Sequence, residues 1–122
     1  MTSPARIVAL ATIFVALASM SCSTSIRLLP PAGVTELRAR AELGIAGAQF
    51  NLGVMYANGR GVLQDGVQAH MWYNLAASRE TGEQRESAVE ARDGVAGLMN
   101  PTQIAEAERL AREWDAAHPR EP

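Results

Sequence analysis

The 122-residue sequence contains no lysine, and all 11 of its basic residues are arginines. Without a lysine amine the chain has no Schiff-base nucleophile, no phosphate-loop lysine and no serine–lysine pair. Several classes of enzyme are therefore excluded, and no cofactor is expected.

The sequence also lacks an excess of charge of one sign and the patterning of β-strands. It has 13 acidic and 11 basic residues and a net charge of −2, so it has no electrostatic footprint for nucleic acid or anionic lipid. A nucleic-acid partner is not expected. No stretch combines alternating hydropathy with β-branched residues, which predicts an all-α fold.

Cys22 is the only cysteine, which excludes an intramolecular disulfide. It ends a segment with the order of a secretory signal, in which one positive charge within residues 1–6 precedes an apolar run over residues 7–20. This run is about 14 residues long, whereas a membrane-spanning helix needs roughly 20. Residues 1–22 are therefore predicted to be a signal peptide, and a transmembrane anchor is the weaker alternative.

Cys22 resembles the lipid-modified cysteine of bacterial lipoproteins and is the candidate lipidation site. Ser19 stands three residues before it, where the lipoprotein cleavage box usually has leucine. Plain cleavage near Ala18 or Ser21 is therefore the alternative. Both routes predict an exported protein of the periplasm. If Cys22 is lipidated, the following Ser23 favours an anchor in the outer membrane by the same resemblance.

Residues 23–33 contain Pro30 and Pro31 and show no helical period, which predicts a flexible linker. A folded domain is expected at residues 34–118. Its first helix is predicted to start from a cap at Thr35 and to end near Gly44.

Two longer helices are expected to follow as a hairpin. One covers about residues 46–58 and stops at Gly59. The other opens with a capping box formed by Asp65 and Gln68. Its inward face is expected to carry Ala69, Trp72, Tyr73 and Ala76.

A second hairpin is expected over residues 82–117. Its first helix runs from about Glu83 to Met99, with an inward face of Ala88, Ala91, Val95 and Leu98. Its second helix begins with Asn100 as cap and Pro101 at the first helical position. That helix keeps its apolar period through Ile104, Ala107, Leu110, Ala111 and Trp114.

The inward residues of the two hairpins repeat at a fixed spacing. Ala69, Trp72, Tyr73 and Ala76 recur 38 residues later as Ala107, Leu110, Ala111 and Trp114. Such a period indicates helical-hairpin repeats. The second unit lacks the glycine-rich loop of the first, which makes it a degenerate capping hairpin.

The stretch of residues 48–62, followed by Gln64–Asp65, Ala69, Trp72–Tyr73 and Ala76–Ala77, resembles a Sel-one-like repeat. This tetratricopeptide-like unit implies a short α-solenoid of about five helices, with its best repeat at residues 46–80. Small residues in it allow close helix packing, aromatic residues fill the space between hairpins, and glycines allow tight turns. These structural positions are Ala48, Leu52, Gly53, Tyr56, Gly59, Gly61, Ala69, Trp72, Tyr73 and Ala76.

The resemblance implies an adaptor whose first helices line a concave surface. On a helical wheel Asn51, Met55 and Asn58 share a stripe beside the core face, which makes them the candidate partner-binding residues. The alternative is that Met55 belongs to the core and Asn58 only ends its helix. Since about three repeats make a self-sufficient stack, homo-oligomerisation is a further expectation.

No catalytic or metal-binding set stands out. His70 has no second histidine, cysteine or carboxylate cluster at ligand spacing, and His118 lies near the end of the chain, so no metal site is expected. The acidic residues Glu86, Glu90 and Asp93 are expected on a solvated helix face.

The sequence therefore predicts a non-enzymatic protein-interaction adaptor or scaffold of the bacterial cell envelope. Its partners are expected to be proteins, and membrane contact is expected only through the signal or a lipid anchor. The first alternative is a structural subunit of a polysaccharide-export or secretion assembly. The weaker alternative is a small β-lactam-acting enzyme, which is implied only by cysteine-rich proteins with the same kind of repeat.

Overall fold

The computed structural model describes residues 32–122, and these residues form helices without strands. The helices are α1 (Ala32–Glu42), α2 (Ala46–Asn58), α3 (Gly66–Arg79), α4 (Gly82–Ala96) and α5 (Pro101–Ala117). The predicted all-α fold of helical hairpins, a short solenoid, is confirmed. The predicted signal peptide, Cys22 and residues 23–31 lie outside the described part of the chain. Within that part, no helix has the length and hydropathy required to cross a bilayer.

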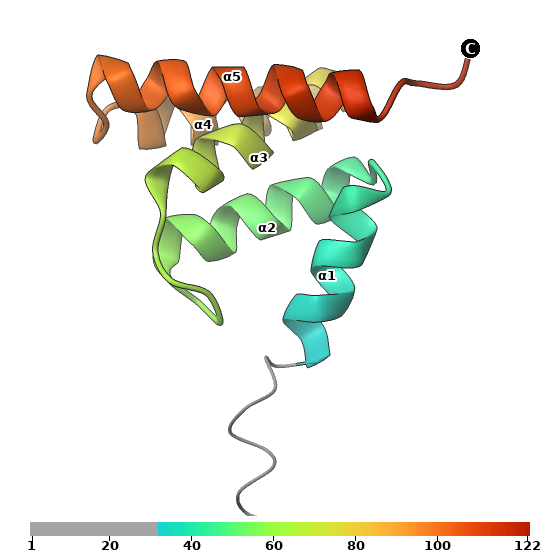
Figure 1. Ribbon diagram of the computed structural model, residues 1–122, viewed down its shortest axis with the longest axis horizontal. Coiled ribbons are helices and arrows are strands. Elements are labelled where there is room, and N and C mark those ends of the chain that lie inside the picture. Colours follow the sequence, from blue (N-terminus) through green and yellow to red (C-terminus); the bar gives the residue numbers. More distant parts are fainter. Residues whose placement is uncertain (1–31) are drawn as a thin grey trace, which may run out of the picture. The chain divides into compact units, whose positions relative to one another are not determined.

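Helix α3 is the centre of the packing (Figure 1). Helices α2, α4 and α5 all pack against it, and α1 packs against α2. Because α3 contacts neighbours on several sides, it buries residues around most of its circumference, including Ala69, Trp72, Tyr73 and Ala76. The residues predicted for its inward face are therefore all buried.

Two helix ends differ from the sequence prediction. Helix α1 begins at Ala32, so Thr35 lies inside it and is not its cap. Helix α4 ends at Ala96, and Leu98, which was expected to face inward, is 90% exposed in the following turn. The residue before Pro101 must be extended, which forces the chain out of the helix here.

Side-chain caps at Asp65 and Asn100 define the starts of α3 and α5, as the sequence predicts. The Asp65 side chain accepts from the Gln68 backbone N–H, while the Asp65 backbone N–H donates to the Tyr56 carbonyl over 3.0 Å. The capping box predicted there is therefore only half formed, because the Asp65 backbone N–H donates to Tyr56 of α2 and not to the Gln68 side chain. At α5, Asn100 and Gln103 form the complete box.

Two glycines of the α2–α3 hairpin stand where a side chain would collide. A Cβ atom on Gly53 would lie 2.7 Å from the Tyr73 ring, so the absence of a side chain lets α2 approach α3 closely. Gly61 has φ +70°, and a Cβ there would lie 2.8 Å from a methyl group of Val34. The loop therefore folds back onto α1 only with glycine at this position.

One side of α3 is filled by large residues. Its core cluster joins Met71, Trp72 and Leu75 of α3 to Leu52 of α2 and Trp114 of α5. The rings of Trp72 and Trp114 meet edge to face with their centroids 6.0 Å apart. This side of α3, with its partners on α1, α2 and α5, is called the filled face below.

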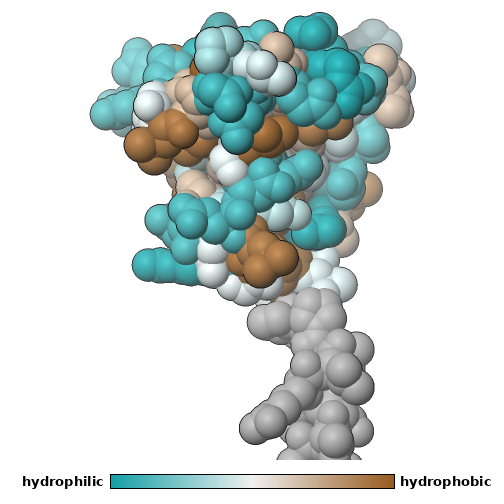
Figure 2. Space-filling model, turned by 60° about the vertical axis from the view of Figure 1, so that its left-hand side comes forward, coloured by the Kyte–Doolittle hydropathy of each residue, from teal (hydrophilic) through white to brown (hydrophobic). Residues whose placement is uncertain are grey.

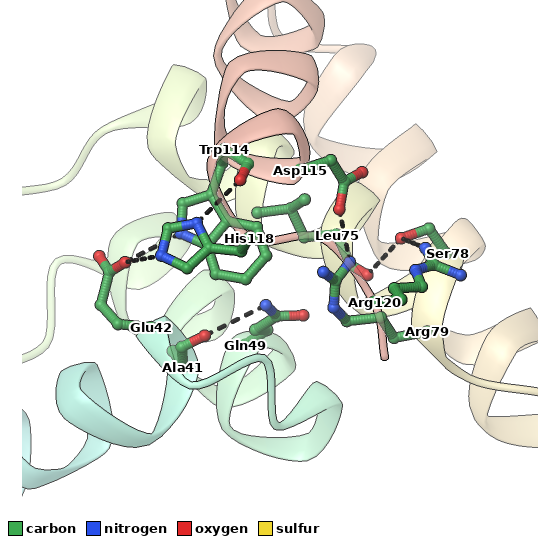
Figure 3. A network of polar contacts seen from close by, with 10 residues as sticks. All are labelled: Ala41, Glu42, Gln49, Leu75, Ser78, Arg79, Trp114, Asp115, His118 and Arg120. Carbon is green, nitrogen blue, oxygen red and sulfur yellow. Dashed lines mark hydrogen bonds and ion pairs between the residues drawn. The ribbon is translucent and has the colours of Figure 1, made fainter. Parts of the chain in front are cut away.

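Polar contacts around Trp114 close the edge of the filled face (Figure 3). The Trp114 indole N–H donates to Glu42 over 2.8 Å, and His118 stacks on the indole with ring centroids 4.0 Å apart. Arg79 lies over the same indole, 4.7 Å from its centroid, and pairs with Asp115 over 2.6 Å. The residues after α5 are thereby held against the end of α1.

The opposite side of α3 is packed by small residues. Ala76 and Ala77 of α3 and Ala88 of α4 form a separate cluster, with Phe50 of α2 and Val89 of α4 packed against it. Alanine side chains fill little volume, so α2 and α4 leave a hollow over this part of α3. We call this side the hollow face.

Candidate functional site

The hollow face carries an open groove of about 240 Å³ between α2 and α4. Its lining residues are Ala46, Gly47, Phe50 and Asn51 of α2, Ala76 and Glu80 at the end of α3, and Gln84, Ser87 and Ala88 of α4. The groove exists because glycine and alanine occupy four of these positions, where larger side chains would close it.

The groove combines an apolar floor with polar walls. Phe50 is half-buried, and its ring centroid lies 5.4 Å from that of Tyr73. Asn51, Gln84 and Ser87 are exposed. No side-chain hydrogen bond within residues 32–122 uses these three side chains. Their donors and acceptors are therefore available to a ligand.

Comparison with known families identifies the hairpin that forms one wall of this groove. Residues 46–80 match the Sel1 repeat, from the first residue of α2 to one residue past α3. The chain carries a Sel1 repeat. Sel1 repeats are typically non-catalytic modules for protein–protein interaction. No curated protein and no solved structure matches the chain.

The Sel1 repeat places only one of the three predicted binding residues in the groove. Asn51 lines it. Met55 is half-buried, and its terminal methyl lies 3.1 Å from the point where a Cβ atom on Gly61 would stand. The Asn58 amide donates to the Val54 carbonyl over 2.9 Å within its own helix. The three residues are not brought together, and their role in binding stays a prediction.

Sequence reasoning missed four groove residues: Phe50, Glu80, Gln84 and Ser87. On α2, the positions of Gly47, Phe50 and Asn51 follow helical spacing and define the groove-facing line. This line is adjacent to the stripe chosen from the helical wheel. The half-buried Phe50 beside the small residues Ala46 and Gly47 is a signal for this line, but only with the position of α4 known.

A second hollow lies at the edge formed by the α2–α3 loop and the α4–α5 turn. It measures about 290 Å³ and is lined by Ala57, Gln64, Gly66, Val95, Leu98, Met99 and Gln103. Leu63 and Leu98 are each 90% exposed. Figure 2 shows hydrophobic residues gathered in separate patches among polar ones on the face it draws. The lining of this loop edge is uncharged, and its two glutamine side chains already bond Ala57 and Asn100, so it offers fewer directional contacts than the groove.

His70 is buried, and in the described residues its Nδ1 atom has no hydrogen-bond partner. Burial lowers its pKa below the usual 6.5, and the nearby Arg92 guanidinium lowers it further. No group of three histidine, cysteine or acidic side chains within residues 32–122 is arranged to hold a metal ion. His70 therefore acts as a buried neutral side chain of the packing.

The acidic residues of α4 lie in solvent. Glu86, Glu90 and Asp93 are all exposed, and Asp93 pairs with Arg92 over 2.9 Å. An exposed carboxylate keeps its hydration, so this surface offers no desolvated acid for proton transfer.

Proposed function

We propose that this protein is a non-enzymatic interaction module that binds a segment of a partner protein in the groove between α2 and α4. The observation that supports this most is an apolar groove beside three polar side chains, Asn51, Gln84 and Ser87, that make no side-chain hydrogen bonds within residues 32–122. Such sites favour a ligand with an apolar anchor and its own donors and acceptors. A peptide segment has both.

The size of the groove favours a peptide over a small-molecule ligand. Pockets for drug-sized molecules usually enclose about 300–1,000 Å³ and bury most of the ligand. This groove measures about 240 Å³ and is open to solvent. It therefore fits one anchoring side chain and the adjoining backbone, which Asn51 and Gln84 can hydrogen-bond as both donor and acceptor.

We further propose that the module works in the bacterial cell envelope, because residues 1–22 have the order of an export signal. Intact-mass measurement of the protein purified from its native host tests this. A lipid adduct on Cys22 supports outer-membrane anchoring. A mature N-terminus near residue 19 or 22 without an adduct supports a soluble periplasmic form, and an uncleaved chain contradicts export.

A structural subunit of a polysaccharide-export or secretion assembly is the second candidate function. The loop edge favours it because Leu63 and Leu98 are exposed there, and large exposed apolar residues can mark protein contacts. A subunit should co-migrate with its complex at fixed stoichiometry, whereas an adaptor should exchange between bound and free forms.

A pair of glycine variants tests the groove. Gly47 lines it, and a Cβ atom there meets nothing within 4 Å, so Gly47→Phe fills the groove without disturbing the helix. Gly94 in α4 has the same open surroundings outside the groove lining, which makes Gly94→Phe the matched control.

The measurement is affinity purification from detergent-solubilised native membranes, quantified by mass spectrometry. We expect a partner protein to be enriched by wild type and by Gly94→Phe and lost with Gly47→Phe. Equal enrichment by all three proteins would contradict the groove as the binding surface. Absence of any enriched protein would contradict the interaction function.

A further inference from the structure

The groove contains a single charged residue, Glu80, which caps the C-terminal end of α3. As a whole residue Glu80 is half-buried, and no ion pair within residues 32–122 involves it. A carboxylate that has no ion-pair partner and lies beside apolar side chains favours a ligand that supplies a cation. We therefore expect the negative charge of Glu80 to influence which ligands bind in the groove.

The neighbouring elements do not neutralise this carboxylate. Helix α2 contains no charged residue along its length. The adjacent Arg79 points to the filled face, where it pairs with Asp115 and lies over Trp114. The α4 residues that line the groove, Gln84, Ser87 and Ala88, are uncharged. The groove thus presents one negative charge and no positive one.

We propose that the groove selects peptide segments with an arginine or lysine two positions from an apolar residue, an inference that rests on the proposed peptide-binding function. The cationic side chain pairs with the Glu80 carboxylate, and the apolar side chain packs on Phe50 and Ala46. In an extended segment, side chains two positions apart point to the same side. The apolar side chain can therefore enter the groove of about 240 Å³ while the cationic side chain approaches Glu80 in its lining.

The spacing is what separates this proposal from general attraction between opposite charges. The exposed acids of α4 attract any basic peptide weakly, and salt screens that attraction. Glu80 lies beside an apolar floor, so a ligand gains from it only when its cation and its apolar residue are correctly placed. The selection is therefore for a pattern and not for net charge.

The test is selection of random linear heptapeptides from a display library on folded full-length protein. Wild type is compared with Glu80→Gln, with the charge reversal Glu80→Arg, and with Glu83→Gln. Glu83 is an exposed acid in the first turn of α4 outside the groove lining, so it is the matched control. Selected peptides are then titrated by fluorescence anisotropy against each variant and against Gly47→Phe.

Wild type and Glu83→Gln are expected to enrich arginine or lysine two positions from an apolar residue. Glu80→Gln should bind these peptides about tenfold more weakly, because the ion pair with the cationic side chain is lost. Glu80→Arg should instead enrich aspartate or glutamate at the same position.

Two other results are distinguishable. The inference about Glu80 is wrong, and the groove function stands, if the selected peptides lose binding in Gly47→Phe but show no cationic preference. The same conclusion follows if Glu80→Arg selects the same peptides as wild type. If no peptide is selected, or if the peptides bind Gly47→Phe as well as wild type, the proposed function itself is contradicted.

Discussion

The filled and hollow faces of α3 are built from residues of different size. On the filled face, Trp72, Leu75 and Trp114 interlock, and hydrogen bonds and ion pairs close the edge. On the hollow face, alanines leave a groove, and the polar side chains around it have no partner in the described residues. The same helix therefore has one side filled by large side chains and one side covered by small ones, beside which a groove remains open to a ligand.

This difference shows how a chain with one Sel1 repeat obtains both stability and a binding surface. Apolar burial scales with area, so the two tryptophans provide much of the stabilising contact in a small helical domain. The hollow face lacks comparable packing of large side chains. Variants on the two faces and at the helix ends should therefore differ in stability, from a large loss at Trp114 to a small effect at the caps.

Truncating Trp114 to alanine should have the largest effect. The residue is 8% exposed and contacts Trp72, Arg79, Glu42 and His118. Loss of a buried tryptophan from a core costs about 3–5 kcal/mol of unfolding free energy. Urea denaturation followed by circular dichroism measures this loss. Ser87→Ala on the hollow face should change the same quantity by less than about 0.5 kcal/mol. Similar losses in both variants would contradict the division.

Two glycines of α2 provide a matched pair. Gly53→Ala places a methyl 2.7 Å from the Tyr73 ring and should lower the unfolding free energy by about 1–3 kcal/mol. Gly47→Ala meets open space in the groove and should raise it by about 0.5–1 kcal/mol, because alanine favours helix more than glycine. Thermal denaturation of both variants checks the opposite signs, and equal shifts would show that α2 does not pack closely on Tyr73.

Removing the side chains of two helix caps should change the unfolding free energy by a smaller amount. Asn100→Ala removes the capping box of α5 and should cost about 1 kcal/mol of unfolding free energy. Thr81 precedes α4, and its side chain makes no capping bond, so Thr81→Ala should leave stability nearly unchanged. Chemical denaturation distinguishes them. An equal loss in both variants would mean that the Asn100 side chain contributes nothing through its cap.

The buried His70 should make stability depend on pH. Burial lowers its folded-state pKa below 6.5, and Arg92 adds to this, while Glu108 and Asp93 oppose it. The unfolded chain therefore binds more protons, so this contribution to stability is complete above about pH 6.5 and is lost as the pH falls. Unfolding curves at about pH 7.5 and about pH 5 should show a smaller drop for His70→Gln than for wild type. An identical drop would assign the pH dependence to other groups.

The helix ends that carry a chemical signal could be predicted from the sequence. Gly59, Asp65 and Asn100 mark their ends because each supplies a backbone conformation or a side-chain acceptor that a helix end requires. Thr35 was placed wrongly as a cap because nothing in the local pattern stops α1 from starting at Ala32. The exposure of Leu98 was missed because Pro101 ends α4 earlier than its apolar period suggests.

The groove could not be predicted because it depends on two helices that are distant in the sequence. The pattern of α2 shows which residues leave the core, but the position of α4 decides which of them line a groove. Asn51 lies on that line, whereas Met55 and Asn58 do not. Glu80, at the end of α3, lacks any local signal that separates it from an ordinary surface acid.

The most direct test of the account is a backbone amide NMR titration of the full chain with the heptapeptide most strongly selected by wild type. We expect chemical shift changes concentrated on the groove side, at Gly47, Asn51, Gln84 and Ser87, with the amides of α5 nearly unchanged. Changes centred on α5, or on the loop edge around Leu63 and Leu98, would contradict the hollow face as the binding surface.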